Sequence, residues 1–177
     1  FNKCNINLKK IFIKNFSEGV QIINQNKDLE NFFKVKINKE VSHVSFFDKS
    51  SFKYSENFNF GTNIIFKDVA KICSIDEQIV KNFISNNINN NIEFNEDEYL
   101  EEDYFINKNF RKIRKKLIID IMKPRIEEIC NIIFNKNINL LSFKKENVKI
   151  FLIVQNESIM EGFKFFFKSC FSQGNNF

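Results

Sequence analysis

The sequence predicts a mixed α/β domain that carries a smaller inserted lobe, and three observations lead to this fold class. Three short runs with strand character follow one another within residues 32–60. Two later stretches, 61–84 and 110–134, place apolar residues at the spacing of amphipathic helices. A short continuous apolar run at 148–154 is typical of a buried strand. Together these elements indicate layers of helices and sheet within one domain of 177 residues.

The first segments are expected to form a strand and then a helix. The β-branched apolar run at 11–13 predicts the strand. Ser17 has a side chain that commonly caps a helix N-terminus, so a helix is expected from there to about residue 27. The residues expected on its inner face are Val20, Ile22 and Ile23.

Three strands are expected next, at 32–37, 43–47 and 52–60. Aromatic residues of the third strand share one parity, which is the period of a half-buried strand. These residues are Phe52, Tyr54, Phe58 and Phe60. The polar residues 48–51 have the composition of a hairpin turn, so the last two strands are expected to be antiparallel neighbours.

Two helices are expected after the strands. The first opens at Gly61 and Thr62, and its apolar residues repeat every three to four positions. These residues are Ile65, Val69 and Ile72. Ser74, with Glu77 three residues later, has the pattern of a capping box, which predicts a second helix through about Ile84.

A run of acidic residues precedes a run of basic ones. The acidic residues are Glu93, Glu96, Asp97, Glu98, Glu101, Glu102 and Asp103. Of the six residues 111–116, five are basic and the sixth is Ile113. We interpret this pattern as a solvated loop that leads into a solvated helix start.

The longest helix is expected over 110–134, where an apolar stripe repeats at helical spacing. The stripe consists of Ile118, Ile121, Met122, Ile126, Ile129 and Ile133. Pro124 lies inside it, and because proline lacks an N–H group a kink is expected there. The chain is expected to continue with a strand at 148–154 and a helix over 158–171.

Composition and motifs exclude several function classes. No uncharged apolar run approaches the roughly 18 residues of a membrane-spanning helix. Glycine occurs only at four separated positions, so neither a P-loop nor a dinucleotide-binding fingerprint is present. The net charge of +5 reflects abundant lysine, which we ascribe to an AT-rich genome, and does not indicate nucleic-acid binding.

Cysteine and histidine offer little catalytic or metal-binding chemistry. Cys4, Cys73, Cys130 and Cys170 lie far apart in sequence, so no zinc-type spacing exists. His43, the only histidine, lies in a predicted strand without a sequence-adjacent partner and is expected to be structural. Free cysteines without an export signal favour the cytoplasm.

Four stretches resemble the second half of the actin-like ATPases, and in particular the bacterial cell-division family FtsA. They are FSEGV at 16–20, FNFGTNIIFKDVA at 58–70, IRKK with IMKPRIEEI at 113–116 and 121–129, and the segment 148–162. The proline-arginine pair followed by two glutamates within a helix is the most specific of these features. The chain begins at Phe1 and is expected to be a fragment of a two-domain protein.

The resemblance implies an actin-like, ribonuclease-H-like domain II. Residues 1–60 and 136–177 would form its core α/β subdomain, and residues 61–135 the smaller inserted subdomain. Two nucleotide-binding turns would lie at 38–42 and 155–158, where none of the family's glycines remains and Lys36 replaces an acidic residue. The nucleotide-facing helix would contribute Gln78 and Lys81.

By position, the nucleotide-binding residues would be Asn38, Lys39, Glu40, Val41, Ser42, Lys81, Gln155, Asn156, Glu157 and Ser158. ATP with Mg²⁺ is the cofactor that the resemblance implies. Because glycine lets the backbone approach phosphates closely, the substituted turns indicate a degenerate site and favour a binding module over an enzyme. No catalytic residue and no metal site are predicted.

The resemblance implies an adaptor that links the FtsZ ring to the inner face of the cytoplasmic membrane at the division site. The C-terminal tail of FtsZ would bind the inserted lobe through Arg125, Glu128, Arg114, Lys115 and Lys116. Self-polymerisation is a further expected interaction, and membrane attachment would need a C-terminal helix that lies outside this sequence. The alternatives are an ATP-binding actin-like protein of another branch, such as a pilus-assembly or cell-shape filament protein, and a nucleic-acid binder suggested only by charge.

Overall fold

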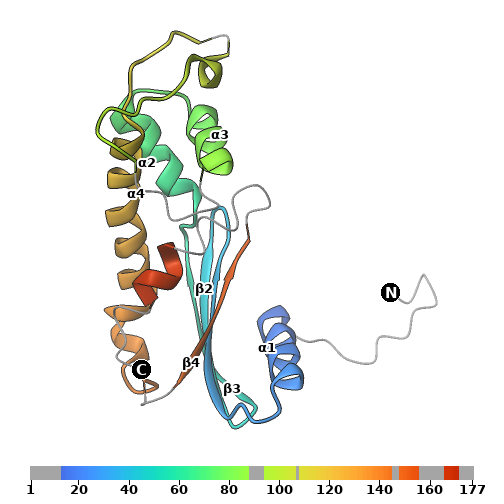
Figure 1. Cartoon of the computed structure of the whole chain (residues 1–177). Coiled ribbons are helices and arrows are strands. Elements are labelled where there is room, and N and C mark those ends of the chain that lie inside the picture. Colours follow the sequence, from blue (N-terminus) through green and yellow to red (C-terminus); the bar gives the residue numbers. More distant parts are fainter. Residues whose placement is uncertain (1–12, 88–93, 107, 145–147, 156–165, 172–177) are drawn as a thin grey trace, which may run out of the picture.

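A four-stranded mixed sheet lies at the centre of the computed structural model, which describes residues 13–87, 94–106, 108–144, 148–155 and 166–171. Helix α1 lies on one side of the sheet, and the long helix α4 runs along the other side (Figure 1). Helices α2 and α3 extend beyond one end of the strands, beside α4. The predicted mixed α/β architecture is confirmed.

The strands are β1 (Asn31–Ile37), β2 (Ser42–Asp48), β3 (Ser51–Phe58) and β4 (Lys149–Val154). Their order in the sheet is β3-β2-β1-β4, with β1–β2 and β2–β3 antiparallel and β1–β4 parallel. The predicted hairpin at 48–51 is confirmed. Lys49 and Ser50 both have positive φ, at 47° and 62°, as a two-residue turn that matches strand twist requires.

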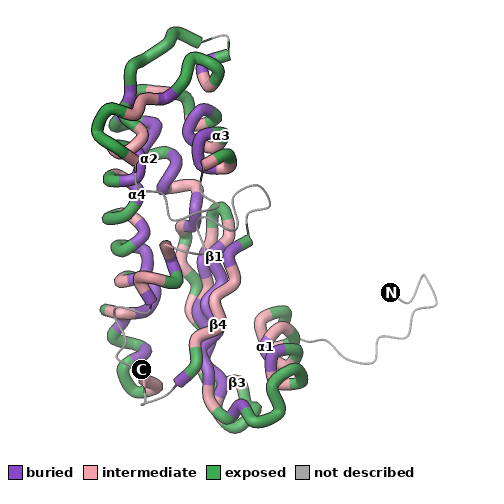
Figure 2. Tube along the Cα trace, in the orientation of Figure 1, coloured by how far each residue is buried: buried purple, intermediate pink, exposed green. Residues whose placement is uncertain are grey.

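Strand β1 divides its side chains between two cores. Phe33, Val35 and Ile37 face the main core, which the helices α2, α3 and α4 complete. Phe32 belongs to a second, smaller core under α1, where its ring stacks on Phe47 with centroids 4.7 Å apart. Figure 2 shows the buried positions along the strands and along the inner faces of the helices. The main core includes residues from both predicted subdomains, and the division at 61–135 stays a prediction.

Helix α1 (Lys14–Gln25) begins one turn earlier than predicted. Ser17 is not its N-cap, because the Ser17 N–H group already donates to the Ile13 carbonyl within the helix. Ile22 is buried against the sheet, and Gly19 lies so close to the Phe47 ring that a Cβ atom would overlap it. Of the predicted strand at 11–13, only the last residue lies within the described residues, and it precedes the helix.

Helices α2 (Asn63–Cys73) and α3 (Glu77–Asn87) confirm the predicted pair, but the predicted capping box is wrong. Ser74 has a left-handed backbone with φ of 53° and ends α2. The N-terminus of α3 is capped by Asp76, whose carboxylate accepts a hydrogen bond from the Gln78 N–H group at 2.8 Å. Ser and Asp are both good caps, and the turn geometry decides between them.

The inner face of α2 also differs from the prediction. Ile65 and Val69 are buried as expected, whereas Ile72 is 62% exposed. The other buried side chains of this helix belong to Phe66, Ala70 and Cys73. The stripe is therefore shifted by one position at its C-terminal end, because α2 packs against both α3 and α4 and its buried face is wide.

Helix α4 (Lys115–Cys130) continues through Pro124 and is followed by a π-helical turn over Asn131–Asn135 and a 3-10 turn over Ile138–Leu140. The predicted stripe is confirmed, with Ile121 half-buried and the other members buried. The kink at Pro124 stays a prediction. The helix starts at 115 instead of 110, because residues 110–113 are not helical and Arg114 forms a β-bridge with Tyr99.

Members of the acidic and basic runs pair with each other, and most of their charged side chains are exposed, as the predicted solvated loop requires. Tyr99 and Arg114 form an isolated antiparallel bridge. The Leu100 N–H group donates to the Ile113 carbonyl at 2.8 Å, and both side chains are buried. A short 3-10 helix, η2 (Glu102–Phe105), contains the last two residues of the acidic run. The charges therefore lie on a folded segment that covers apolar side chains.

The C-terminal part is only partly as predicted. Ile150 to Ile153 in β4 are half-buried instead of buried on both faces, and within the described residues β4 pairs with β1 alone. Residues 166–171 are helical, and the earlier part of the predicted helix at 158–165 lies outside the described residues. None of the helices in the described part of the chain has the length and apolarity needed to cross a bilayer.

Candidate functional site

The hairpin between β1 and β2 meets the start of α2 at one end of the sheet. The Asn38 N–H group donates to the Val41 carbonyl at 3.0 Å and closes the turn. The carbonyl groups of Asn38 and Lys39 then accept hydrogen bonds from the N–H groups of Thr62, at 2.9 Å, and Asn63, at 3.0 Å. Helix N-termini carry free N–H groups that need acceptors, and here the hairpin supplies two of them.

Side chains reinforce this contact. The Asn63 amide donates to the Glu40 carboxylate, which joins the exposed part of the turn to the first residue of α2. The Ser42 hydroxyl is buried and donates to the Phe60 carbonyl at 2.8 Å. The turn is thus held by backbone and side-chain bonds to the segment that follows β3.

Two backbone approaches bring further predicted residues to this end of the sheet. A Cβ atom on Gly61 would overlap the Asn38 carbonyl oxygen, so a side chain does not fit there. The Gln155 N–H group donates to the Ile37 carbonyl at 2.9 Å, next to the hairpin. The structure therefore brings 38–42 and Gln155 together. The other predicted residues of the second turn, Asn156, Glu157 and Ser158, lie outside the described residues.

Lys81 has its contacts elsewhere. It forms an ion pair with Glu77 at 3.4 Å on the same helix, and its ammonium group lies 5.6 Å from the Phe66 ring centroid. Gln78, the other predicted residue of this helix, hydrogen-bonds Asn82. Both predicted nucleotide-facing residues therefore lie on α3 and contact side chains of α3 itself or of α2.

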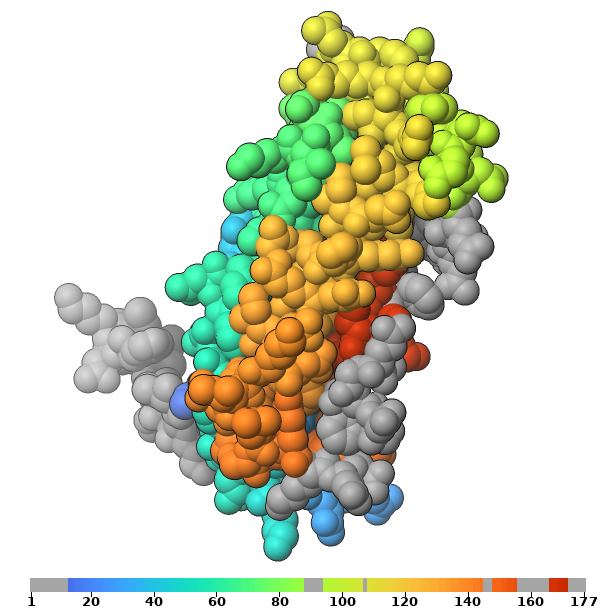
Figure 3. Space-filling model, turned by 90° about the vertical axis from the view of Figure 1, so that its left-hand side faces the viewer, coloured from blue at the N-terminus to red at the C-terminus, as the bar shows by residue number. Residues whose placement is uncertain are grey.

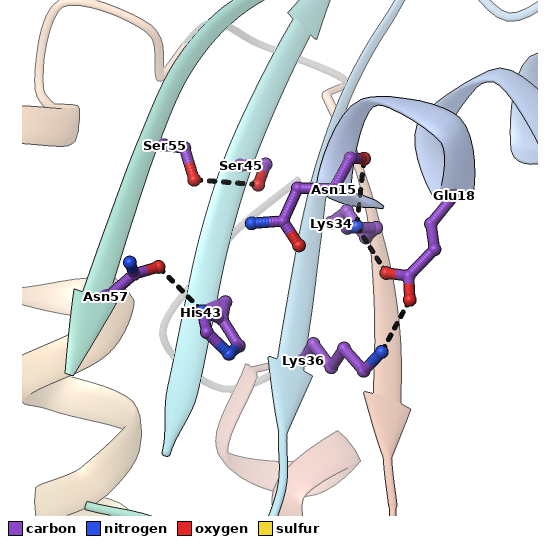
Figure 4. Close-up of polar contacts among 8 residues, drawn as sticks. All are labelled: Asn15, Glu18, Lys34, Lys36, His43, Ser45, Ser55 and Asn57. Atoms are coloured by element: carbon purple, nitrogen blue, oxygen red, sulfur yellow. Dashed lines mark hydrogen bonds and ion pairs between the residues drawn. The ribbon is translucent and has the colours of Figure 1, made fainter. Parts of the chain in front are cut away.

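Two buried lysines share one carboxylate under α1, close to the hairpin (Figure 4). The Lys34 Nζ atom lies 2.7 Å from one oxygen of Glu18, and the Lys36 Nζ atom lies 2.6 Å from the other. Lys34 also donates to the Asn15 carbonyl at 3.1 Å and is fully buried. Of the two lysines, only Lys36 was singled out from the sequence, as the residue that replaces an acidic one in the family resemblance. The signal for the pair was the shared parity of Lys34, Lys36 and the buried Phe32.

The contact shifts the pKa values of Glu18 and Lys34. Burial acts to raise the pKa of Glu18, but the hydrogen bonds and charges of the two lysines outweigh it and lower that pKa. Burial lowers the pKa of Lys34 despite the opposing effect of Glu18. Both carboxylate oxygens are engaged at ion-pair distance, which fits the charged form of all three groups. The cluster then carries one positive charge in excess.

A polar stripe continues from these lysines across the sheet. His43 lies opposite Lys36 on one side and Asn57 on the other, and its Nδ1 atom lies 2.6 Å from the Asn57 side-chain oxygen. Ser45 occupies the corresponding position beside Lys34 and contacts Ser55. Within the described residues no group of three or more His, Cys, Asp or Glu side chains is arranged to hold a metal ion.

The predicted partner-binding residues fall into two groups. On α4, Arg125 forms ion pairs with Asp68 of α2 and with Glu128 one turn further along its own helix. Arg125 is therefore a link between the two helices as well as a partly exposed cation. Its neighbour Glu128 remains exposed.

The second group pairs with the acidic run. Arg114 lies 3.5 Å from Glu96, Lys116 pairs with the same carboxylate, and Lys115 lies 2.5 Å from Glu101. The Lys116 hydrogen bond lowers the pKa of Glu96, and the Lys115 hydrogen bond lowers the pKa of Glu101. The three cations at the start of α4 thus share two carboxylates of the acidic run, so their charge is only partly neutralised by these pairs.

Comparisons with known proteins identify the fold. No family model and no curated protein matches the sequence. MreB5 of Spiroplasma citri bound to ADP matches with a TM-score of 0.55 and 12% identity over 99% of this chain and 65% of that one. The PilM-PilN type IV pilus biogenesis complex matches with a TM-score of 0.55 and 8% identity over 92% of this chain and 40% of that one.

A third solved structure, the ethanolamine utilization protein EutJ from Carboxydothermus hydrogenoformans, has a TM-score of 0.51 and 11% identity over 82% of this chain and 43% of that one. An archaeal actin homolog matches with a TM-score of 0.51. The chain covers less than two thirds of each of these structures. The shared architecture confirms the predicted actin-like fold.

Proposed function

We propose that this chain is part of an actin-like adaptor that resembles FtsA and acts through protein partners in cell division. The end of the sheet at the 38–41 hairpin, where the resemblance places the nucleotide, does not bind ATP. The observation that carries the proposal is the closed hairpin at 38–41. Its carbonyl groups accept hydrogen bonds from the N-terminus of α2. The family resemblance places the nucleotide here, where an actin-like site would need room for phosphate.

The chemistry of the hairpin fits a polyphosphate poorly. Phosphates bind backbone N–H groups, often at glycine-rich turns and helix N-termini. Here the N–H groups of Thr62 and Asn63 already have acceptors, and the turn presents the Glu40 carboxylate. Among the described residues the buried Asn38 side-chain oxygen has no hydrogen-bonding partner, and as an acceptor it would repel phosphate. The Lys36 ammonium group is engaged in an ion pair with Glu18 of α1, on the face of the sheet that α1 covers.

A second function is supported by the fold comparisons. The MreB5 structures contain ADP or AMPPNP, and the PilM structure is a pilus biogenesis complex. On this reading the chain belongs to an ATP-binding actin-like protein of a cell-shape or pilus-assembly branch. Its hairpin would then have to release α2 when nucleotide binds, and the exposed Glu40 would have to turn away.

Nucleotide binding separates the two functions. A fluorescent ATP analogue with Mg²⁺ is titrated against the purified protein that contains this chain. The adaptor proposal predicts no saturable binding below millimolar concentration, and a micromolar Kd would refute it. A variant with glycine at 38, 39 and 40 tests the cause, because restored binding would identify these side chains as the obstacle.

The FtsZ tail is the proposed partner, and Arg125 is its proposed contact on α4. The charge of Arg125 is shared with two carboxylates, so an acidic tail would compete with Asp68 and Glu128 for it. We expect Arg125→Ala to weaken binding of a labelled tail peptide about tenfold, equivalent to about 1.4 kcal/mol. Lys123→Ala, at an exposed position of the same helix, is the matched control. Equal affinities of the two variants would contradict this contact.

A further inference from the structure

Two cysteines from distant parts of the chain meet on one side of α4. Cys130 is the last residue of α4 and is buried, and Cys170 lies in the helical segment 166–171 and is half-buried. Figure 3 shows this segment lying against α4 along the face of the molecule. Cys170 packs against the core to which Cys130 belongs, and each thiol shifts the pKa of the other through a side-chain hydrogen bond.

Aromatic packing holds the two segments together around the thiols. The Phe134 and Phe171 rings meet edge to face with centroids 5.7 Å apart. Phe167 is fully buried in the main core, to which Cys130 also belongs. The contact between the thiols therefore belongs to the packed core, and both backbones are positioned by side chains other than the cysteines themselves.

The two thiols differ in acidity and in access to solvent. The hydrogen bond with Cys170 and the burial of the site raise the pKa of Cys130. The same hydrogen bond lowers the pKa of Cys170, against the opposing effects of burial and of the Glu127 carboxylate. Thiolates, not thiols, react with oxidants. Cys130 is buried whereas Cys170 is half-buried, so Cys170 is the thiol that an oxidant reaches first and Cys130 is positioned to resolve the product.

We propose that Cys130 and Cys170 are a site of reversible oxidation, at which a peroxide converts the two thiols into a disulfide that ties segment 166–171 to α4. The Cys170 thiolate attacks one oxygen of hydrogen peroxide, so an S–O bond forms, the O–O bond breaks and hydroxide leaves. The Cys130 sulfur then attacks the sulfenic sulfur of Cys170. The S–S bond forms, the hydroxyl leaves as water with the Cys130 proton, and two electrons have passed to the peroxide.

The disulfide would change the stability of the module. It closes a long loop that contains β4, and a cross-link over a long loop restricts the unfolded chain. The oxidised protein is therefore expected to melt several degrees above the reduced protein. A small thiol reductant restores the starting state.

Peptide mapping by mass spectrometry tests the proposal on the purified protein after treatment with hydrogen peroxide. We expect a cross-linked pair of peptides containing Cys130 and Cys170, lighter by two hydrogen atoms and separated by dithiothreitol. Cys73→Ser is the matched control, because Cys73 is also buried but lies in α2, and this variant should cross-link as the wild type does. Cys130→Ser should instead accumulate a sulfenic acid at Cys170, detected with dimedone.

The wild-type map alone can overturn the proposal, whatever the variants do to folding. Sulfenic or sulfinic acid at Cys170 without a cross-link would show that the thiols cannot reach bonding geometry. A cross-link from either cysteine to Cys73 instead would show that the described contact is not the reactive one. An unchanged melting temperature in a fully cross-linked sample would refute the stabilising role.

Discussion

Replacing Glu18 by glutamine tests whether the shared carboxylate under α1 holds the helix on the sheet. The substitution leaves Lys34 and Lys36 buried beside a neutral amide. Loss of one partner from a buried ion pair costs about 3–5 kcal/mol. The Glu18 side chain is 21% exposed, and glutamine keeps one acceptor oxygen, so we expect a loss of about 2–3 kcal/mol. For a chain of this size that corresponds to a fall in Tm of about 5–10 °C.

The assay is urea denaturation followed by circular dichroism, with Glu30→Gln at an exposed position as the matched control. Lys34→Met supplies a second comparison. It removes the excess positive charge, leaves Glu18 paired with Lys36, and is expected to cost little, because an apolar side chain suits the buried position. In the Lys34→Met background, Glu18→Gln should be less harmful, since one buried cation instead of two loses its partner.

The pH dependence has a defined sign. The pKa of Glu18 is lower in the folded protein than its ordinary value of 4.5, so its contribution is fully present above that value. The contribution is lost as the pH falls through the folded-state pKa. The difference in stability between wild type and Glu18→Gln should therefore shrink in acid. A difference below about 0.5 kcal/mol at pH 7, within the range of an ordinary surface substitution, would refute the reasoning.

Three further substitutions have expected outcomes that denaturation curves can check. Gly61→Ala should cost about 1–3 kcal/mol, because its Cβ atom overlaps the Asn38 carbonyl oxygen, and a wild-type midpoint would show that the hairpin yields easily. Asp76→Ala should destabilise the start of α3 at pH values above the lowered pKa of Asp76, and should have less effect in stronger acid, where the wild-type cap is protonated. An effect that does not depend on pH would argue against the cap. Phe134→Ala should cost about 3–5 kcal/mol, whereas the nearby Ile132→Ala, at a position 45% exposed, should cost much less; equal losses would contradict the assigned burial.

Local periodicity was enough to predict most of the elements. Strands β1, β2 and β3 were visible as short runs bounded by turn residues, because alternation and turn composition are properties of neighbouring residues. The buried stripe of α4 was visible for the same reason, since helical spacing repeats within a few turns. The motifs of the resemblance then predicted the actin-like fold, which the solved structures confirm.

Helix ends and charge partners were less predictable. Ser74 and Asp76 are both suitable caps, and only the left-handed turn at Ser74 assigns the role to Asp76. The acidic and basic runs carry no local signal that shows which of their charges pair, because these contacts join residues far apart in sequence. Such choices depend on which backbone segments the fold brings side by side.

The sequence by itself determined the order of most strands and helices, the buried face of α4, and the absence of glycine from the hairpin at 38–41. Only the tertiary structure decided that this hairpin bonds to α2, that Lys34 and Lys36 share Glu18, and that Cys130 meets Cys170. The physical reason is range. Periodicity and turn chemistry act between neighbours, whereas the partner of a buried charge, carbonyl or thiol is set by packing between segments that the chain brings together only when it folds.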